Sequence, residues 1–363
     1  MNIQKATRQY EEWLATFTPL IKPDVTFKHK EMASGPFPFL RATFYRWVQV
    51  WPDVCRGLAS APAVLSIGDL HIENFGLWRD AEGRLVWGIN DFDEASHLPY
   101  TQDISRLAAS ALLAIESDRL SLRPETACDA ILGGYSDGLK AKGRPFVLAE
   151  SHDWLRKIAI GVLREPGPYW KKLEALPIVT ENVPESAVVA LEHIMPRPTP
   201  VYAIKHRIAG LGSLGRPRYV ALAEWYGGHI AREAKALVPS STAWARQAGA
   251  SAEIFYQAIV DRAVRCRDPF VQLQGHWIVR RLAPDCSRIE LTSLKEEKLE
   301  TELLRAMGWE TANVHMGCGP AIGDVRRDLA KRKKGWLLDA ARAMQEATVA
   351  DWRAWEASAR VRK

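Results

Sequence analysis

The chain has 363 residues, 47% hydrophobic and 25% charged, with a net charge of +6 at pH 7, which is the composition of an ordinary globular protein. Its length predicts two domains or two lobes, and the lack of any apolar run of ~18 residues predicts that no membrane is spanned. The basic residues are interleaved with acids, so the mild positive charge favours a polyanionic ligand such as a nucleotide and disfavours nucleic acid.

The five cysteines and the N-terminal sequence both favour a cytoplasmic location. The cysteines form no C-x-x-C pair and are odd in number, so neither structural zinc nor a disulfide framework is expected. Residues 1–5 lack the basic and then apolar layout of a signal peptide. A reducing compartment fits these features.

Helical spacing of apolar residues dominates the first part of the chain. The expected helices span residues 3–17, 38–51, 102–117, 124–141 and 184–195. Between the second and the third of these, a short apolar run at 64–67 ends in Gly68-Asp69. Two further apolar runs, 75–78 and 85–89, flank a polar turn that contains glycine, which is typical of a β-hairpin.

A Pro-rich stretch at residues 195–200 excludes helix and marks a stiff linker. The pattern then changes to that of strands. The expected strands lie at 201–208, 219–225, 229–237 and 277–282. The remaining expected helices lie at 249–266, 295–316, 322–334 and 336–358.

Three polar residues frame the predicted hairpin and are expected to converge. Asp69 and Asn74 stand five positions apart in the loop that enters it, and Asp91 follows its second strand. A strand, a turn and a returning strand bring the two ends together. Phosphoryl transfer needs a carboxylate near the attacking hydroxyl and oxygen ligands for Mg²⁺, and these side chains supply both. The alternative is that these polar side chains lie at the open end of the hairpin and only stabilise turns.

A G-x-G-x-x-G string at residues 210–215 makes Gly210, Gly212, Ser213 and Gly215 candidate nucleotide-binding residues. Rossmann folds use the same string, but there it opens into a helix and an acid follows about 20 residues later. Here a β-branched and aromatic run at 219–223 follows. The loop is therefore expected between two strands, like the glycine flap that lays bare backbone over the phosphates in kinases.

The next predicted strand carries a lysine suited to the same ligand. Alternation along a strand would direct Glu233 and Lys235 to one face, and the flanking alanines suit a lysine that grips the α- and β-phosphates. An acid on the following helix is expected to pair with it, either Glu253 or Asp261. The alternative is a surface hairpin whose lysine extends into solvent.

The loop G-D-L-H-x-x-N at residues 68–74, followed by I-x-D-F-x-x-A at 89–95, resembles the catalytic and metal loops of aminoglycoside phosphotransferase-like kinases. The resemblance implies that Asp69 is the catalytic base and that Asn74 and Asp91 hold Mg²⁺.

The same resemblance assigns supporting roles. His71 would order the loop, and Asp103 matches the later buried acid that braces the site in that family. There are two departures, because Ile67 stands where the family has histidine, and Asp93 replaces the glycine of D-F-G, where it either adds a metal ligand or alters the flexibility of the loop. Arg41 is a candidate contact for phosphate or substrate, although an arginine beside aromatic residues more often packs or forms an ion pair.

The glycine loop follows the catalytic loop in this chain, whereas it precedes it in ordinary kinases. Two unrelated motifs, two separate domains or a circular permutation would each give this order. Permutation is favoured by the segment after Lys235, where a strand at 277–282, a short connection and a helix with the pattern G-x-x-x-A-x-x-H at 308–315 occur in the order that precedes the catalytic loop in aminoglycoside-type kinases. A circular permutation whose new chain ends lie in an exposed connection costs little stability.

The chain also resembles, nearly end to end, a bacterial family known only as domain of unknown function 2252. The matching stretches lie at residues 30–41, 68–74, 90–94, 210–215, 235 and 279–282. One departure is that the family usually reads Lys-Glu-Ala at the lysine, where this chain reads Glu-Ala-Lys-Ala at 233–236. The family name supplies no substrate, but it implies a fold and a nucleotide site.

These observations predict an α+β, two-lobed, protein kinase-like fold in circularly permuted order. Residues 1–196 are expected to form a mostly helical lobe, 197–284 a small antiparallel β lobe, and 285–363 helices that return to the helical lobe beside residues 1–60.

The expected function is ATP- and Mg²⁺-dependent transfer of the γ-phosphate to a hydroxyl of an unidentified small molecule or protein. One alternative, motivated by Ile67 and Asp93, is a nucleotide-binding pseudokinase that serves as an interaction module. Another is nucleotidyl transfer to a protein on the same fold.

Overall fold

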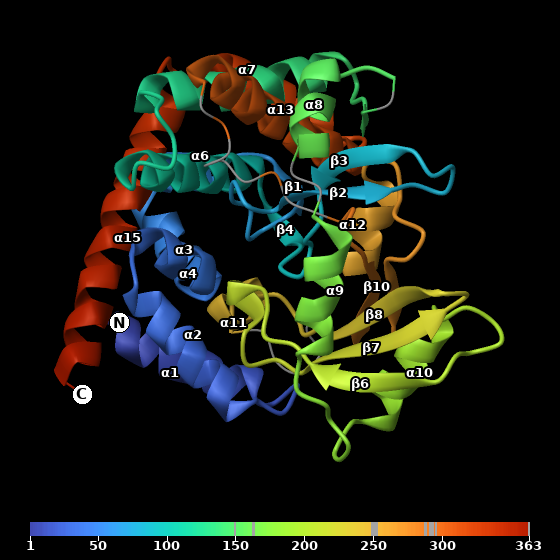
Figure 1. The fold of residues 1–363 in the computed structure, drawn as a ribbon. Coiled ribbons are helices and arrows are strands. Elements are labelled where there is room, and N and C mark those ends of the chain that lie inside the picture. Colours follow the sequence, from blue (N-terminus) through green and yellow to red (C-terminus); the bar gives the residue numbers. More distant parts are fainter. Residues whose placement is uncertain are drawn as a thin grey trace.

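The computed structural model describes residues 1–148, 150–161, 164–247, 253–286, 289, 294 and 296–361. Helices make up most of it, and a five-stranded antiparallel sheet lies to one side of the helical body (Figure 1). The predicted α+β class is confirmed. Within the described ranges, no helix is long and apolar enough to cross a membrane.

Helices surround short strands in the first part of the chain. The helices are α1 (Ile3–Leu14), α2 (Lys22–Ala33), α3 (Pro36–Ala42), α4 (Phe44–Val54), α5 (Arg56–Ala59), α6 (Tyr100–Glu116), α7 (Pro124–Lys140), α8 (Asp153–Gly161), α9 (Pro166–Glu174) and α10 (Glu185–His193). The strands are β1 (Ala63–Ser66), β2 (Phe75–Arg79), β3 (Leu85–Ile89), β4 (Ser96–Pro99) and β5 (Phe146–Val147). β1 pairs with β4, and β2, β3 and β5 form a three-stranded sheet.

The larger sheet comes from the segment after the Pro-rich stretch. Its strands are β6 (Tyr202–His206), β7 (Arg218–Trp225), β8 (Gly228–Ala236), β9 (Gln272–Gln274) and β10 (Trp277–Leu282). They lie in the order β6-β7-β8-β10-β9, and each neighbouring pair is antiparallel. Ala234 and Ala236 of β8 pack with α10 on one face of the sheet. Because side chains alternate along a strand, Glu233 and Lys235 lie on the opposite face.

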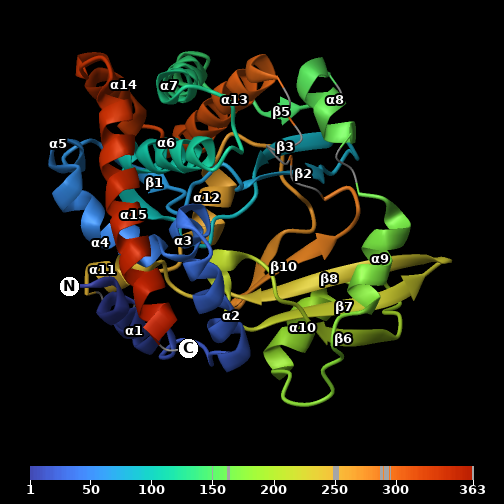
Figure 2. The same cartoon turned by 60° about the vertical axis from the view of Figure 1, so that its left-hand side comes forward.

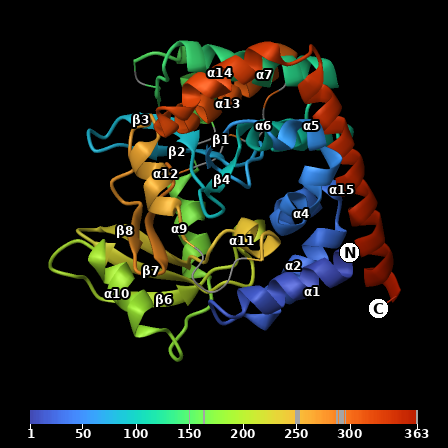
Figure 3. The same ribbon diagram turned by 180° about the vertical axis from the view of Figure 1, so that it is seen from behind.

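The last helices return to the first ones. After the sheet strand β8 come α11 (Ser241–Ala245), α12 (Tyr256–Arg262), α13 (Glu297–His315), α14 (Ala321–Lys331) and α15 (Trp336–Val361). α15 packs on α6 and on α1 to α4, so that the two ends of the chain lie close together (Figures 2 and 3). α15 therefore lies beside the helices of residues 1–60.

Glycines let α7 and α13 pack very closely against each other. A Cβ atom added to Gly134 would lie 1.8 Å from the carbonyl oxygen of Arg305, and one added to Gly308 would lie 2.0 Å from that of Ile131. Neither position has room for a side chain. This approach fixes α13, whose last residue, His315, contacts Asp103 of α6.

Some elements differ from the sequence prediction. The helix expected at 38–51 is interrupted at Thr43, whose backbone is not helical (φ −127°, ψ 41°), and becomes α3 and α4. Residues 249–252, at the start of the helix expected at 249–266, lie outside the described residues, and α12 begins only at Tyr256. α10, assigned by sequence to the region 1–196, packs on the larger sheet.

Candidate functional site

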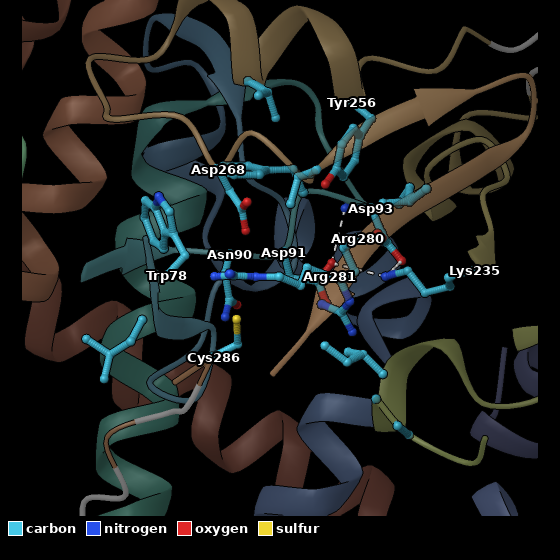
Figure 4. A pocket seen from close by; sticks show the side chains of 18 of the residues that line it. Trp78, Asn90, Asp91, Asp93, Lys235, Tyr256, Asp268, Arg280, Arg281 and Cys286 are labelled. Atoms are coloured by element: carbon cyan, nitrogen blue, oxygen red, sulfur yellow. Dashed lines mark hydrogen bonds and ion pairs between the residues drawn. The ribbon is translucent and has the colours of Figure 1, made fainter. Parts of the chain in front are cut away.

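The two candidate half-sites meet between the larger sheet and the hairpin. The ammonium Nζ of Lys235 lies 2.5 Å from Oδ2 of Asp93 and 3.6 Å from Oδ1 of Asp91 (Figure 4). Lys235 comes from β8, whereas the two aspartates lie in the loop that follows β3. The structure therefore brings together residues that are remote in the sequence.

The acid that pairs with Lys235 differs from the one expected. The prediction placed it on the following helix, at Glu253 or Asp261. Asp261 is instead paired with Arg267 at 3.1 Å, and Glu253 is exposed. α12 packs its other side into the main core and so turns Asp261 towards solvent. The carboxylates that pair with Lys235 belong to the predicted metal loop itself.

Asp91 and Asp93 share this cation and differ in their affinity for a proton. Burial raises the pKa of Asp93 to about 6, with a further contribution from the neighbouring Asp91 carboxylate. At Asp91 burial acts in the same direction, but the Lys235 ammonium outweighs it and holds the pKa below its usual range. Oδ1 of Asp93 is buried and has no hydrogen-bond partner among the described residues, which leaves an oxygen available to a bound cation.

Asp69 is held by a buried arginine. Nε of Arg106 donates to Oδ1 of Asp69 at 2.9 Å, and Nη2 also contacts that oxygen. The guanidinium lies 4.9 Å from the ring centres of Phe44 and Trp47, and Nη2 donates to the carbonyl of Leu40 at 2.8 Å. Burial raises the pKa of Asp69 to about 6, although Arg106 opposes the shift. Sequence reasoning missed Arg106, whose position three residues after Asp103 on a helix was the available signal.

Asp103 ties the start of the Asp69 loop to the core. Its two oxygens accept hydrogen bonds from the backbone N–H groups of Ile67 at 2.8 Å and Gly68 at 3.0 Å. Nε2 of His315 lies 2.9 Å from Asp103 Oδ2, and both side chains are fully buried. Gly68 has φ +86°, and an added Cβ would lie 2.3 Å from the carbonyl oxygen of Glu94, so only glycine fits there.

Asn74 and His71 order the rest of the loop through each other. Oδ1 of Asn74 accepts from the backbone N–H of His71 at 2.9 Å, and the N–H of Asn74 donates to the His71 carbonyl at 2.9 Å. The N–H of Asn90 donates to the Asn74 carbonyl at 3.0 Å, which places Asn74 beside the residue that precedes Asp91. A carbonyl oxygen has two lone pairs, so Asn74 Oδ1 retains one for a ligand.

The glycine loop between β6 and β7 lies directly on Asp69. Gly210 and Gly215 adopt left-handed backbone conformations, with φ +73° and +95°. A Cβ added to Gly212 would lie 3.2 Å from Oδ2 of Asp69. Oγ of Ser213 donates to the Gly210 carbonyl at 3.1 Å and so bonds within the loop.

Arg41 is engaged in an ion pair. Its Nη1 lies 2.7 Å from Oε2 of Glu73, and its guanidinium lies 6.0 Å from the ring centre of Phe37. Its backbone carbonyl oxygen would lie 3.1 Å from a Cβ added to Gly212. Arg41 thus lies at the edge of the site, where it packs on Phe37 and forms an ion pair with Glu73. Packing or pairing is the more common of the two roles expected for it.

A cavity of about 580 Å³ opens beside Lys235, and its lining includes six cationic and three anionic side chains. This volume suits a nucleotide-sized ligand. Its cationic lining residues are Arg164, Arg207, Lys235, Arg265, Arg280 and Arg281. Its carboxylates are Asp91, Asp93 and Asp268 (Figure 4). A much smaller cavity of about 40 Å³ lies over Asp69, and both cavities touch Asp91, Asp93 and Gly210.

The residues present fit a magnesium–nucleotide complex better than a metal held by protein alone. Across the described ranges, no group of three or more His, Cys, Asp or Glu side chains could hold a metal ion. Mg²⁺ in nucleotide sites uses one or two carboxylates and completes its shell with phosphate and water. Asp91, Asp93 and Asn74 offer such a set, and the unpartnered Asp93 oxygen is an independent observation in its favour.

Residues 20–161 match the family model described as an uncharacterized protein conserved in bacteria (DUF2252). The family recognised from the sequence is thereby confirmed over that span. The matched region contains the Asp69 loop and the aspartates after β3, and it ends before the glycine loop and Lys235. A search of curated proteins and a search of solved structures found no match.

Proposed function

We propose that this protein is a magnesium-dependent transferase that uses a nucleoside triphosphate such as ATP. The observation that carries the proposal is the 3.6 Å approach of Lys235 Nζ to Asp91 Oδ1, with the glycine loop closing over Asp69 beside them. One ligand in the cavity beside Lys235 would reach all of these groups. The sequence motifs alone predict transfer of the γ-phosphate to a hydroxyl, with nucleotidyl transfer as the alternative on the same fold.

A permuted, two-lobed kinase-like arrangement accounts for the order of the parts. A glycine loop joins the first two strands of the larger sheet, and the lysine stands on the third. The aspartates and the asparagine come from the hairpin on the other side of the cavity. Helix α13, which is late in the sequence, packs against β1 and brings His315 to Asp103. The parts of a kinase site would then be assembled from a chain in which the catalytic loop precedes the glycine loop.

Each side chain has a role in this proposal. Asp69 orients the acceptor hydroxyl or removes its proton, and Arg106 fixes the direction of its carboxylate. With a pKa near 6, Asp69 is mostly ionised at neutral pH and can accept a proton. Asp91, Asp93 and Asn74 hold Mg²⁺, which supplies neutralisation of the charge on the phosphates.

The ion pair of Lys235 keeps the site ready for its ligand. When no ligand is bound, the Lys235 ammonium is neutralised by Asp91 and Asp93. When these carboxylates turn to a metal ion, the ammonium is available to a phosphate group. A buried lysine is thus compensated in both states, which avoids the cost of an isolated buried charge.

Ligand binding tests the proposal without knowledge of the acceptor. ATP should raise the Tm of the full chain, and more so with Mg²⁺ than with EDTA, because a ligand at 100 times its Kd stabilises a fold by about 2.7 kcal/mol. Asp91→Asn should lose the Mg²⁺-dependent part of the shift. Asp261→Asn, an exposed carboxylate on α12, is the matched control and should keep it. A wild-type Tm that ATP and Mg²⁺ leave unchanged would refute the proposal.

A nucleotide-binding module without turnover is the second candidate. The observation in its favour is the cavity over Asp69, which at about 40 Å³ has room for a few waters but not for a whole acceptor molecule larger than water. A Tm shift with Mg²⁺ and ATP, combined with no consumption of ATP over many hours, would favour this candidate over the enzyme.

A further inference from the structure

Three arginines surround a buried glutamate next to Lys235. Glu233 is fully buried, and its Oε1 accepts from Nη1 of Arg218 at 2.9 Å and from Nε of Arg280 at 2.7 Å. Arg207 contacts its other oxygen. Glu233 and Lys235 are two residues apart on one face of β8, a separation of about 7 Å. We call Arg207, Arg218 and Arg280 the arginine group.

The arginine group makes this end of the cavity suitable for phosphate. Three guanidinium groups and one carboxylate leave a net charge of +2 there. Arg207 and Arg280 line the cavity, with side chains 23% and 30% exposed, so they can still reach a ligand. Guanidinium groups match phosphate oxygens in a bidentate geometry. A nucleobase placed against them would bury charged groups without satisfying them.

Two more arginines lie at the same end. Arg281 follows Arg280 on β10, and its buried Nε has no hydrogen-bond partner among the described residues. The backbone N–H of Arg164 donates to the Pro284 carbonyl at 3.4 Å, just beyond the end of β10, and Arg164 also lines the cavity. Positively charged side chains that line the cavity therefore extend beyond the arginine group.

Apolar and aromatic side chains line the same cavity. Ile278 of β10 is the direct cross-strand neighbour of Lys235. Tyr256 and Val260 of α12, with Val271 before β9, line the same cavity. These side chains offer the surface that a base and a ribose require.

The cavity over Asp69 is a poor place for a terminal phosphate. It is lined by the four carboxylates of Asp69, Asp91, Asp93 and Glu94 and by only two arginines, Arg41 and Arg216, and it has a volume of about 40 Å³. The most highly charged part of a triphosphate would meet like charge there and find little room. The structure thus offers phosphate sites in one direction from Lys235 and not in the other.

We infer that a nucleoside triphosphate binds with its β- and γ-phosphates towards Arg207 and Arg280 and its α-phosphate at Lys235 and Asp91, and that the group transferred is a nucleoside monophosphate. This inference rests on the proposed function and selects one of its two reactions. The acceptor oxygen forms a bond to the α-phosphorus while the bond from that phosphorus to the bridging oxygen of the β-phosphate breaks. Pyrophosphate leaves with the electron pair, held by the two arginines, and the proton of the acceptor hydroxyl passes to Asp69.

The reaction products test the inference directly. The full chain is incubated with Mg²⁺ and ATP labelled at either the α- or the γ-phosphorus, and water serves as the acceptor. AMP and pyrophosphate are expected. ADP and inorganic phosphate as the only products would overturn the inference and leave the proposed transferase intact.

Binding decides the question even if hydrolysis is too slow to measure. Arg207→Gln and Arg280→Gln should each weaken ATP binding about tenfold and leave AMP binding within about threefold, because only ATP carries the phosphates that these arginines hold. Arg267→Gln, at an exposed arginine outside the cavity, is the control and should change neither. Equal losses of affinity for ATP and for AMP would place the nucleobase at the arginines and overturn the inference. A wild-type chain that binds neither nucleotide would instead refute the proposed function.

Discussion

Lys28 of α2 donates a hydrogen bond of 3.2 Å to the carbonyl oxygen of Gly212, in the glycine loop that covers Asp69. The same helix region holds the loop at a second point, where the backbone N–H of Ile21 donates to the Gly215 carbonyl at 2.8 Å. A side chain from the first helices thus reaches the backbone of a loop that lies far along the sequence. We expect this contact to hold the loop in place over Asp69.

Removing the Lys28 amine should loosen the glycine loop. A hydrogen bond from a charged donor contributes about 1.5–3 kcal/mol, so Lys28→Met should speed amide hydrogen exchange at residues 211–213 about tenfold or more. Lys30→Met, at an exposed position on the same helix, is the control. Exchange rates in the loop that are the same in both variants would show that Lys28 does not hold it.

Activity should fall as the pH drops through about 6. Burial raises the pKa of Asp69 to about 6, and the base must be ionised to accept a proton. Asp93 has a similar pKa, but a metal ion bound to it would lower that value and leave Asp69 to set the acid limb. The logarithm of kcat for ATP consumption, measured from pH 5 to 8, should decline with unit slope below pH 6. A profile that stays flat down to pH 5 would contradict the assignment of Asp69.

Gly68→Ala should be far more damaging than Gly83→Ala. Both glycines have positive φ, +86° and +73°, so each alanine carries a similar backbone strain of about 1–2 kcal/mol. At Gly83 an added Cβ meets nothing within 4 Å, whereas at Gly68 it lies 2.3 Å from the Glu94 carbonyl oxygen. Chemical denaturation should show a loss of unfolding free energy near the strain value for Gly83→Ala and a clearly larger loss for Gly68→Ala. Equal losses would mean that the loop can move away from Glu94.

Asp103 and His315 should behave as one unit. Their side chains are both fully buried and lie 2.9 Å apart, so that removing one leaves a buried polar atom of the other without its partner. Asp103→Asn and His315→Gln should each destabilise the fold by about 1–3 kcal/mol. The double variant should lose less than the sum, with a coupling energy of about 1–3 kcal/mol in chemical denaturation. Strict additivity would contradict a direct interaction across α6 and α13.

The sequence identified the residues that stand in motifs, and it missed those that act through long-range contacts. Asp69, Asn74 and Asp91 could be placed together because a hairpin returns the chain to its starting point. Lys235 was found from its flanking alanines and its spacing from the glycine loop. Its partners Asp91 and Asp93 were not, since nothing local to either segment records which part of the chain faces it.

Helix α2 was missed for a physical reason that also hid Lys28. Its buried side chains are Asp24, Lys28 and Met32, at a regular spacing of four, and two of the three are charged. A search for apolar periodicity treats such residues as exposed. Pro23, which suits the first turn of a helix, was the usable signal.

The measurement that tests the central claim most directly is a double-mutant cycle on ATP affinity with Mg²⁺ present, using Lys235→Met, Asp91→Asn and the double variant in calorimetric titrations. One nucleotide site shared by the two segments predicts that each single variant weakens binding about tenfold or more, and that the double variant loses less than the product of the two effects. Unchanged affinity in both single variants, or independent effects that multiply fully, would contradict a single site built from the two halves of the chain.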